Sequence, residues 1–316
     1  MGRIFSLIWN EVSKIFIQKS TWIMYIFLAL LVVAVAVITA TTDMAGKEYG
    51  ADWQEELEAE NEQLAEEMQE EEFLTEVNTQ EIEMNRYHID NDIKPVPYDA
   101  WQFVIDNAML SSVISLLTII VAGGIVANEF RWGTIKQLLI RPIPRSMILL
   151  SKYIAVLIFA MITLVFLLVL SWLTGALVFG VAGSNPELAI RSHEGIVSVS
   201  AIGEVVGGYG FKLVNLFMMA TFAFMISSIF RNSALAIGTA VFLMMAGTSI
   251  VQFFADKSWS KYILFANTDL TVYDSLLGPV REEMTMGFSI VVLAVYWIVF
   301  IVAAWLFFTK RDVAGQ

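Results

Sequence analysis

Side chains that could carry out catalysis are sparse in this sequence, and few of them stand at useful spacings. The 316 residues include no cysteine, which excludes thiolate chemistry, thiolate metal sites and disulfides. The two histidines, His88 and His193, have no companions at metal-ligand spacing, which favours ordinary loop residues over ligands. The sequence also lacks G-x-x-x-x-G-K-[ST], G-x-S-x-G and H-E-x-x-H. We therefore expect no enzymatic activity, no metal and no cofactor in this chain.

One basic stretch, residues 128–146, stands out between two apolar runs. It reads NEFRWGTIKQLLIRPIPRS and carries four of the nineteen Lys and Arg. Apolar and basic residues are interleaved over 129–141, and Pro142 disfavours helix at the residue before it. The pattern predicts a short amphipathic helix. Such a helix could dock into a separate protein, lie flat on lipid headgroups, or only fix the membrane topology.

The apolar runs indicate a membrane protein. Of the residues, 57% are hydrophobic and 16% are charged, whereas about a quarter are charged in an ordinary soluble domain. About 20 apolar residues cross the hydrocarbon core, and unbonded backbone amides are costly there, so continuous runs of that length predict helices. The runs are 22–40, 103–127, 147–181, 205–230, 234–254 and 287–308. We expect an all-α membrane protein with six transmembrane helices.

The distribution of Lys and Arg predicts the orientation. Eleven of the nineteen fall in the N-terminal, second-to-third, fourth-to-fifth and C-terminal segments. Cytoplasmic segments next to spans retain positive charge, so both termini are expected in the cytoplasm. The first run exceeds the roughly 7 to 15 residues of a signal-peptide core, which favours a retained span. We predict a multi-pass protein of a bacterial-type cytoplasmic membrane, with an N-terminal amphipathic segment before the first span.

The net charge of −12 comes from one segment, because residues 41–101 contain nineteen Asp and Glu against three Lys and Arg. Strong helix formers over 52–77 predict an acidic extracellular helical insertion, and one helix of about 30 residues would reach roughly 45 Å. The apolar stripe of this segment is thin, which fits a solvated hairpin or a partly disordered loop. The negative electrostatic field of its carboxylates fits a vestibule or a partner surface. The chain thus divides into 1–40 (amphipathic segment and first span), 41–101 (insertion) and 102–316 (other spans), with a re-entrant-like segment at 255–285.

Polar and small residues inside the spans give two further candidate sets. Polar residues recur on one face of the second span, which is therefore a candidate lining of a transport pathway. The pathway candidates are Asn107, Ser111, Ser112, Ser115, Asn215 and Gln252. Small residues let helices approach closely, so the fifth span is a candidate interface with a second chain, and packing within the chain is the alternative. The interface candidates are Ala236, Gly238, Ala240 and Gly247.

The basic stretch resembles the signature of permeases of ABC-2 type ATP-binding-cassette exporters. The matching residues are Glu129, Gly133, Thr134, Leu138, Leu139, Arg141, Pro142, Arg145 and Lys152. The six spans, the inside termini and the amphipathic N-terminal segment are similar to that family as well. The long acidic loop departs from its compact members.

The resemblance implies a specific assembly. The N-terminal segment would be a connecting helix along the inner surface, and 129–141 a coupling helix in a groove of a separate ATPase subunit. The segment 255–285 would form an external gate. Two permease chains, identical or homologous, would combine with two ATPases, and those ATPases would hold Mg-ATP.

The docking hypothesis assigns roles to side chains of the coupling helix. The basic residues expected to pair with acids of the ATPase are Arg131, Arg141 and Arg145, and the apolar residues expected to fill its groove are Phe130, Trp132 and Leu139. Glu129 is expected to orient the helix from its first turn. Gly133 is expected to allow close approach, or else is only a tolerated weak helix former.

We expect the transmembrane permease subunit of an ATP-driven exporter that moves an amphipathic or hydrophobic cargo, first of all an antimicrobial peptide. Its expected partners are the ATPase, a second permease, membrane lipid and the cargo, with no nucleic acid. The alternative is a non-transporting membrane sensor or scaffold that uses the acidic outer helix as a receptor surface. An ion-coupled carrier is disfavoured, because no charged residue lies at the centre of a predicted span.

Overall fold

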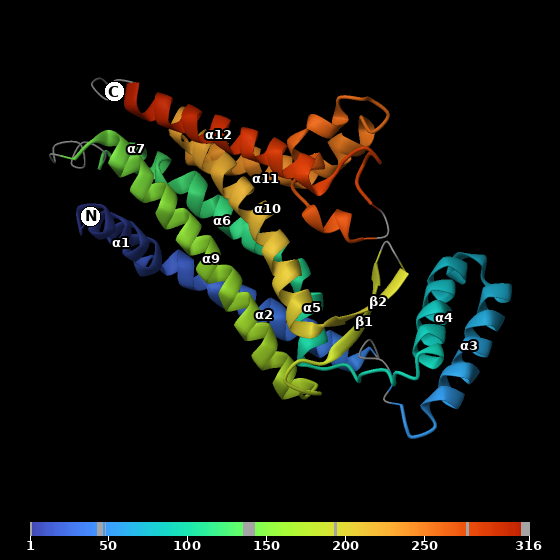
Figure 1. Ribbon diagram of the computed structural model, residues 1–316. Helices are drawn as coiled ribbons and strands as arrows, with labels where there is room; N and C mark the ends of the chain where they lie inside the picture. The colour runs from blue at the N-terminus through green and yellow to red at the C-terminus, as the bar shows by residue number, and fades with distance from the viewer. Residues whose placement is uncertain are drawn as a thin grey trace. The chain divides into compact units, whose positions relative to one another are not determined.

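The computed structural model describes residues 2–42, 47, 49–134, 143–192, 195–275 and 278–310. The six predicted spans are confirmed as helices that are long and apolar enough to cross a membrane (Figure 1). They are α2 (Lys19–Thr41), the run Ala100–Arg131, α9 (Arg145–Val178), α10 (Ala201–Phe230), α11 (Ser233–Phe253) and α12 (Met286–Lys310). The chain separates into two compact units, and each is described by itself.

The first unit comprises Met1–Val32, Asn107–Leu170 and Gly207–Gln316. It begins with α1 (Gly2–Ile17), an amphipathic helix that buries Val12 and Ile15 and exposes Phe5 and Trp9. A break at Gln18 separates α1 from α2. The side chain of Thr21 stabilises this bend, because its Oγ1 donates a hydrogen bond to the Ile15 carbonyl at 2.6 Å. The predicted amphipathic N-terminal segment is therefore a separate helix joined to the first span.

The second span is built from several short pieces. They are α5 (Ala100–Asn107), the 3-10 turn η2 (Ala108–Leu110), α6 (Ser111–Ile125) and α7 (Ala127–Arg131). Ser227 of α10 fastens its end, since Ser227 Oγ donates to the Gly123 carbonyl at 2.7 Å and accepts from the Ala127 amide at 3.1 Å. The apolar core of the unit surrounds this junction of α6, α9, α10, α11 and α12.

The small residues of α11 pack inside the chain, against α6 and the segment after α11. Ala236 and Ala240 are buried, and a Cβ added to Gly123 of α6 would lie 2.7 Å from Ile237 Cγ1. A Cβ added to Gly247 would collide with the ring of Phe265. The predicted permease interface is therefore wrong for Ala236, Ala240 and Gly247, because close helix packing within the chain uses them. Gly238 faces open space.

The segment between α11 and α12 folds into three short 3-10 helices, η3 (Ser260–Tyr262), η4 (Leu264–Ala266) and η5 (Leu270–Tyr273). A buried polar chain ties them to α12. Ser289 Oγ donates to Asn267 Oδ1 at 2.7 Å and lies 2.6 Å from Tyr273 Oη. The segment predicted as re-entrant-like, 255–285, thus contains three 3-10 helices.

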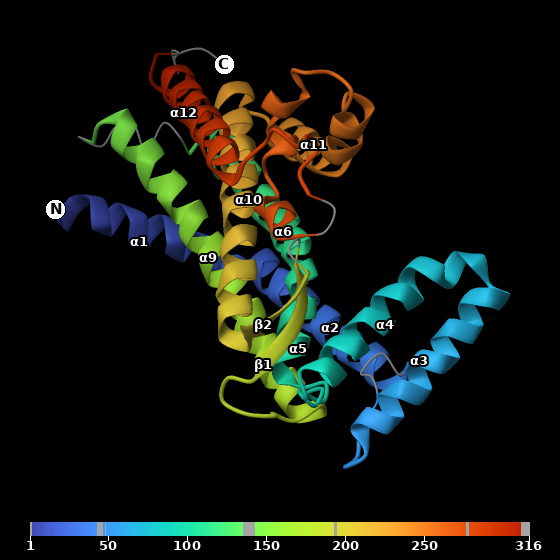
Figure 2. The same cartoon turned by 45° about the vertical axis from the view of Figure 1, so that its right-hand side comes forward.

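The second unit comprises Val33–Asp106 and Ser171–Val206 and contains the acidic insertion. Figures 1 and 2 show α3 (Trp53–Glu70) and α4 (Thr75–Asp90) side by side, joined by η1 (Glu72–Leu74). Asn85 Nδ2 donates to Asn61 Oδ1 at 3.0 Å, and Asn78 Nδ2 donates to the Leu64 carbonyl at 3.2 Å. A single helix of about 30 residues is therefore wrong, because the chain turns back at 71–74 and folds as a hairpin.

A two-stranded antiparallel sheet completes the second unit and was not predicted. Strand β1 (Glu187–Ser192) pairs with β2 (Gly195–Ser200), with Glu187 opposite Ser200. Arg191 of β1 lies 3.5 Å from Glu83 of α4 and also donates to the Gln80 carbonyl. The fold is mainly helical, as predicted, with this one hairpin of strands between α9 and α10.

Candidate functional site

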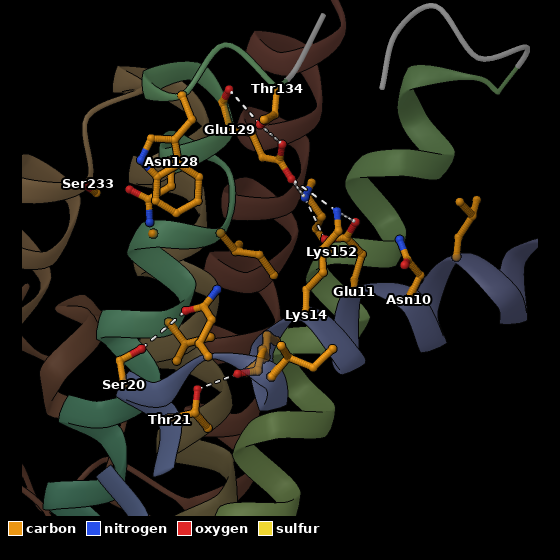
Figure 3. A pocket seen from close by; sticks show the side chains of 18 of the residues that line it. Asn10, Glu11, Lys14, Ser20, Thr21, Asn128, Glu129, Thr134, Lys152 and Ser233 are labelled. Atoms are coloured by element: carbon orange, nitrogen blue, oxygen red, sulfur yellow. Dashed lines mark hydrogen bonds and ion pairs between the residues drawn. The ribbon is translucent and has the colours of Figure 1, made fainter. Parts of the chain in front are cut away.

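Two acids and two lysines from three helices form a single ion cluster (Figure 3). Lys152 Nζ of α9 lies 2.7 Å from Glu11 Oε2 of α1 and 2.9 Å from Glu129 Oε1 of α7. Lys14 Nζ lies one turn after Glu11, at 2.9 Å from Glu11 Oε1 and 3.5 Å from Glu129 Oε1. The cluster joins α1, the end of the second span and the beginning of the third.

Because the cluster is buried, its stability depends on the balance of its positive and negative charges. The side chain of Lys152 is 1% exposed and that of Glu11 is 6% exposed. Taking one such ion out of water costs several kcal/mol, so each charge needs a close partner of opposite sign. Two ammonium groups face two carboxylates, and the cluster is neutral as a whole.

Lys14 is the most exposed member, with a side chain that is 43% exposed. Burial lowers its pKa, but the hydrogen bond and charge of Glu11 and the charge of Glu129 outweigh that effect. The pKa of Lys14 is therefore raised above its ordinary value. The ammonium stays charged throughout the physiological range.

A tight turn after α7 adds a hydroxyl to the cluster. Gly133 has a φ of 72°, in the left-handed region that favours glycine. The turn brings Thr134 back to α7, and its Oγ1 donates a hydrogen bond to Glu129 Oε2. The predicted close approach at Gly133 is not observed, because no atom of the described residues lies within 4 Å of a Cβ built there. The glycine is needed for the backbone conformation instead.

The predicted coupling helix over 129–141 is wrong at its beginning. The helix that contains Glu129 is α7, which continues the second span and ends at Arg131. Glu129 therefore pairs with lysines and does not orient the first turn of a separate helix. Four candidates lie outside the described residues: Leu138, Leu139, Arg141 and Pro142.

Two other docking candidates are used inside the chain. Phe130 packs edge-on against Phe308 of α12, with ring centroids 6.3 Å apart, and the Arg231 guanidinium lies 4.2 Å from the Phe130 ring centroid. Arg145 Nη1 donates to the Thr309 carbonyl at 3.2 Å. Phe130 cannot fill a partner's groove while it is packed in this way, so that prediction is wrong for this structure.

Arg131 and Trp132 remain at the surface. The Trp132 side chain is 60% exposed, and the Arg131 guanidinium lies 5.6 Å from the Trp132 ring centroid. An exposed aromatic beside an arginine is a common composition for the centre of a protein interface. These two residues are the described part of the basic stretch that a partner could reach.

Three of the six pathway candidates do not line an open surface. Asn107, Ser111 and Ser115 are buried, so a pathway lining is wrong for these three in the observed conformation. Ser112 and Gln252 are exposed and Asn215 is half-buried, and their role in a pathway stays a prediction.

A cavity of about 1320 Å³ adjoins the ion cluster. It lies between α1, the first turns of α2, the end of α6, α7 and the beginnings of α9 and α11. Charged residues of the cluster line it together with apolar side chains such as Met24 and Val121. Figure 3 shows Asn128 and Ser233 beside this cavity, opposite the cluster. The cavity is therefore amphipathic.

The sequence contains a pattern that could have predicted this site, although a search for spaced motifs does not detect it. Glu11 is the sole acid among the first 42 residues, and Glu129 is the sole acid between Asp106 and Glu187. An isolated acid in an apolar region needs a cation nearby, and the lysines at 14 and 152 are such cations. Glu11 and Lys14 were not among the predicted site residues.

Comparison with known proteins identifies relatives over most of the chain. The family model described as "Protein of unknown function (DUF2705)" matches residues 73–314. "Uncharacterized protein YhcI" of Bacillus subtilis (strain 168) is 41% identical over 315 residues, which cover 98% of this chain and 99% of the relative. "Uncharacterized membrane protein YdbK" of the same organism is 35% identical over 206 residues, which cover 65% of this chain and 79% of the relative.

Proposed function

Starting from a chain that belongs to the DUF2705 family and is a multi-pass membrane protein, we propose that it is the transmembrane permease subunit of an ATP-driven exporter of the ABC-2 type. A separate ATPase docks on the segment between the second and third spans and supplies the energy. Two permease chains and two ATPases form the transporter. The cargo is amphipathic or hydrophobic, and a peptide is the first candidate.

The observation that carries this proposal is the Glu129–Lys152 ion pair at 2.9 Å. It ties the end of the second span to the beginning of the third, so the segment between them is braced at both ends. A segment that transmits force from another subunit needs such bracing, because loose ends would absorb the motion. Lys152 also binds Glu11, so the same motion reaches α1.

The charge distribution supports a cytoplasmic location for this end of the first unit. The ion cluster, the Arg145–Thr309 hydrogen bond and the Arg231–Phe130 contact bring together α1, the basic segment, the α10–α11 turn and the end of α12. Positive residues concentrated beside spans favour the cytoplasmic side. An ATPase in the cytoplasm would therefore meet the exposed Arg131 and Trp132.

Co-purification tests the proposal. The tagged chain is purified from its native host, and we expect an ATP-binding-cassette ATPase to elute with it. The Arg131→Glu, Trp132→Ala variant should retain less than about a tenth of the ATPase, since charge and an anchor side chain are both lost. Lys257→Glu with Trp259→Ala, a matched change elsewhere on the surface, should retain it all. Failure of any nucleotide-binding subunit to elute with the unchanged chain would refute the proposal.

The acidic hairpin favours the second candidate function, a membrane sensor or scaffold. Its two helices are fastened together by Asn78 and Asn85, and most of its carboxylates point to solvent. Deletion of residues 52–92 separates the two functions. An exporter keeps its ATPase and its transport activity without the hairpin, whereas a sensor loses its response.

A further inference from the structure

The cavity beside the ion cluster has the composition of a lipid site. Its volume of about 1320 Å³ exceeds the roughly 300–1,000 Å³ of sites for drug-sized ligands. Its lining has a polar part, which includes Lys14, Asn128 and Arg131, and an apolar part, which includes Met24, Ile120 and Val121 of the span helices. A ligand that fits both parts has a polar head and a long apolar tail.

The polar part favours an anion. All four carboxylate oxygens of the cluster already accept bonds: Glu11 from Lys14 and Lys152, and Glu129 from Lys152 and Thr134. The lining holds three cationic side chains against two carboxylates, which leaves an excess of one positive charge. The lining therefore has a surplus of positive charge, and its carboxylate oxygens are already bonded.

Two donors are uncommitted within the described part of the chain. The guanidinium of Arg131 forms no ion pair with a described residue, and it lies over the ring of Trp132. The side-chain amide of Asn128, which faces the cavity in Figure 3, has no hydrogen-bond partner among the described residues. A guanidinium and an amide together suit the oxygens of a phosphate, which accept several hydrogen bonds at once.

The position of α1 indicates that the anion belongs to a lipid. Exposed Phe5 and Trp9 give α1 the pattern of a helix that lies in the headgroup region, and residues of α1 and α2 line the cavity. The apolar wall of the cavity belongs to helices that cross the bilayer. A soluble phosphate would leave that wall without a partner.

We propose that this cavity binds an anionic membrane phospholipid, with its phosphate on Arg131 and Asn128 and an acyl chain along Met24 and Val121. Phosphatidylglycerol has the required charge and tails. The site goes beyond the proposed function, because it needs neither nucleotide nor an ATPase. The lipid fills the space between α1 and the ion cluster and holds α1 in its observed orientation.

Native mass spectrometry of the purified, delipidated full chain in detergent tests the site. The three probes are dioleoyl phosphatidylglycerol, dioleoylglycerol and sn-glycerol 3-phosphate. We expect one tightly held phosphatidylglycerol per chain and at least tenfold weaker binding of the other two. Equal binding of dioleoylglycerol would show that the phosphate is not recognised, and equal binding of glycerol 3-phosphate would show a soluble-phosphate site. Either result overturns the proposal.

Variants assign the lipid to this cavity. Arg131→Gln with Asn128→Leu should weaken phosphatidylglycerol binding at least tenfold, whereas Arg86→Gln, the same charge change on the exposed face of α4, should leave it unchanged. Met24→Trp fills the apolar part and should also weaken binding. Size-exclusion chromatography checks that each variant elutes as the unchanged chain does. If both cavity variants hold the lipid as tightly as the unchanged chain, the lipid binds elsewhere and the proposal is wrong.

Discussion

Lys152 Nζ of α9 and Glu11 Oε2 of α1 lie 2.7 Å apart, although 141 positions separate the two residues in the sequence. Each side chain is almost fully buried. The pair fastens α1 to the first turns of α9, and Glu129 shares the same lysine. One buried ammonium therefore binds acids from two other segments, beside the apolar contacts of Val12 and Ile15 with Phe159.

Removal of that ammonium should be strongly destabilising. Lys152→Met leaves Glu11 and Glu129 buried with only Lys14 as a partner, and breaking a buried pair in this way costs about 3–5 kcal/mol. Thermal unfolding in a fixed detergent measures the loss. Lys47→Met removes a pair of similar length, Lys47 to Glu56 at 2.8 Å, but at the surface. The control should lose no more than about 1 kcal/mol.

The loss from Lys152→Met should be partly reversible by further neutralisation. Adding Glu11→Gln and Glu129→Gln removes the uncompensated carboxylates and leaves only Lys14, which is half-exposed. Replacing a complete buried ion group is often neutral or even stabilising, so the triple variant should recover about 1–4 kcal/mol. Strictly additive losses in the same unfolding measurement would contradict a shared charge balance.

The spans were predictable from sequence because bilayer thickness sets their length and hydrocarbon excludes unpaired backbone. Local composition carries that information. The end of the second span was harder to predict, because α7 continues through Glu129 and Phe130 to Arg131 although two of these three side chains are charged. The ion cluster compensates the charge of Glu129. A hydropathy profile contains no information about a partner that comes from another helix.

The small residues of α11 show the same limit. Their spacing predicted a close helix contact, and Gly123 against Ile237 confirms that α11 makes one. Spacing does not identify the partner helix, so a second chain was the predicted partner and packing within the chain was the alternative. The acidic insertion is similar, because composition predicted helix and left a hairpin as one alternative, without locating the turn at 71–74 that pairs α3 with α4.

Identical substitutions at two glycines of α11 should have opposite effects. Gly247→Ala places a Cβ against the Phe265 ring, whereas Gly238→Ala places one in open space. Overpacking a fixed contact costs about 1–3 kcal/mol, and Gly→Ala inside an unhindered helix gains roughly 0.5–1 kcal/mol. The unfolding midpoint should fall for the first variant and rise slightly for the second. Equal shifts would mean that α11 does not pack on this segment as observed.

The acidic hairpin should depend on a single buried leucine. Leu57 of α3 is fully buried, and Leu57→Ala at a core position costs about 2–5 kcal/mol locally. Amide hydrogen exchange over α3 and α4 should accelerate, while exchange in α9 stays unchanged. Val77→Ala on α4 is the matched control, because Val77 is largely exposed. Unchanged exchange in the Leu57 variant would indicate that the hairpin is held by its polar bonds alone.

The turn after α7 provides a test that joins structure to function. A non-glycine residue at φ near +70° costs roughly 1–2 kcal/mol, and asparagine tolerates this conformation best. Gly133→Val should therefore displace Thr134 from Glu129, whereas Gly133→Asn should preserve that hydrogen bond. A Cβ at position 133 has no atom of the described residues within 4 Å, so the comparison tests the backbone conformation. Recovery of the ATPase in co-purification should fall several-fold for the valine variant and return with asparagine. If the valine and asparagine variants retain equal amounts of the ATPase, the left-handed turn does not hold the docking segment. The force proposed to pass through that segment is then transmitted elsewhere.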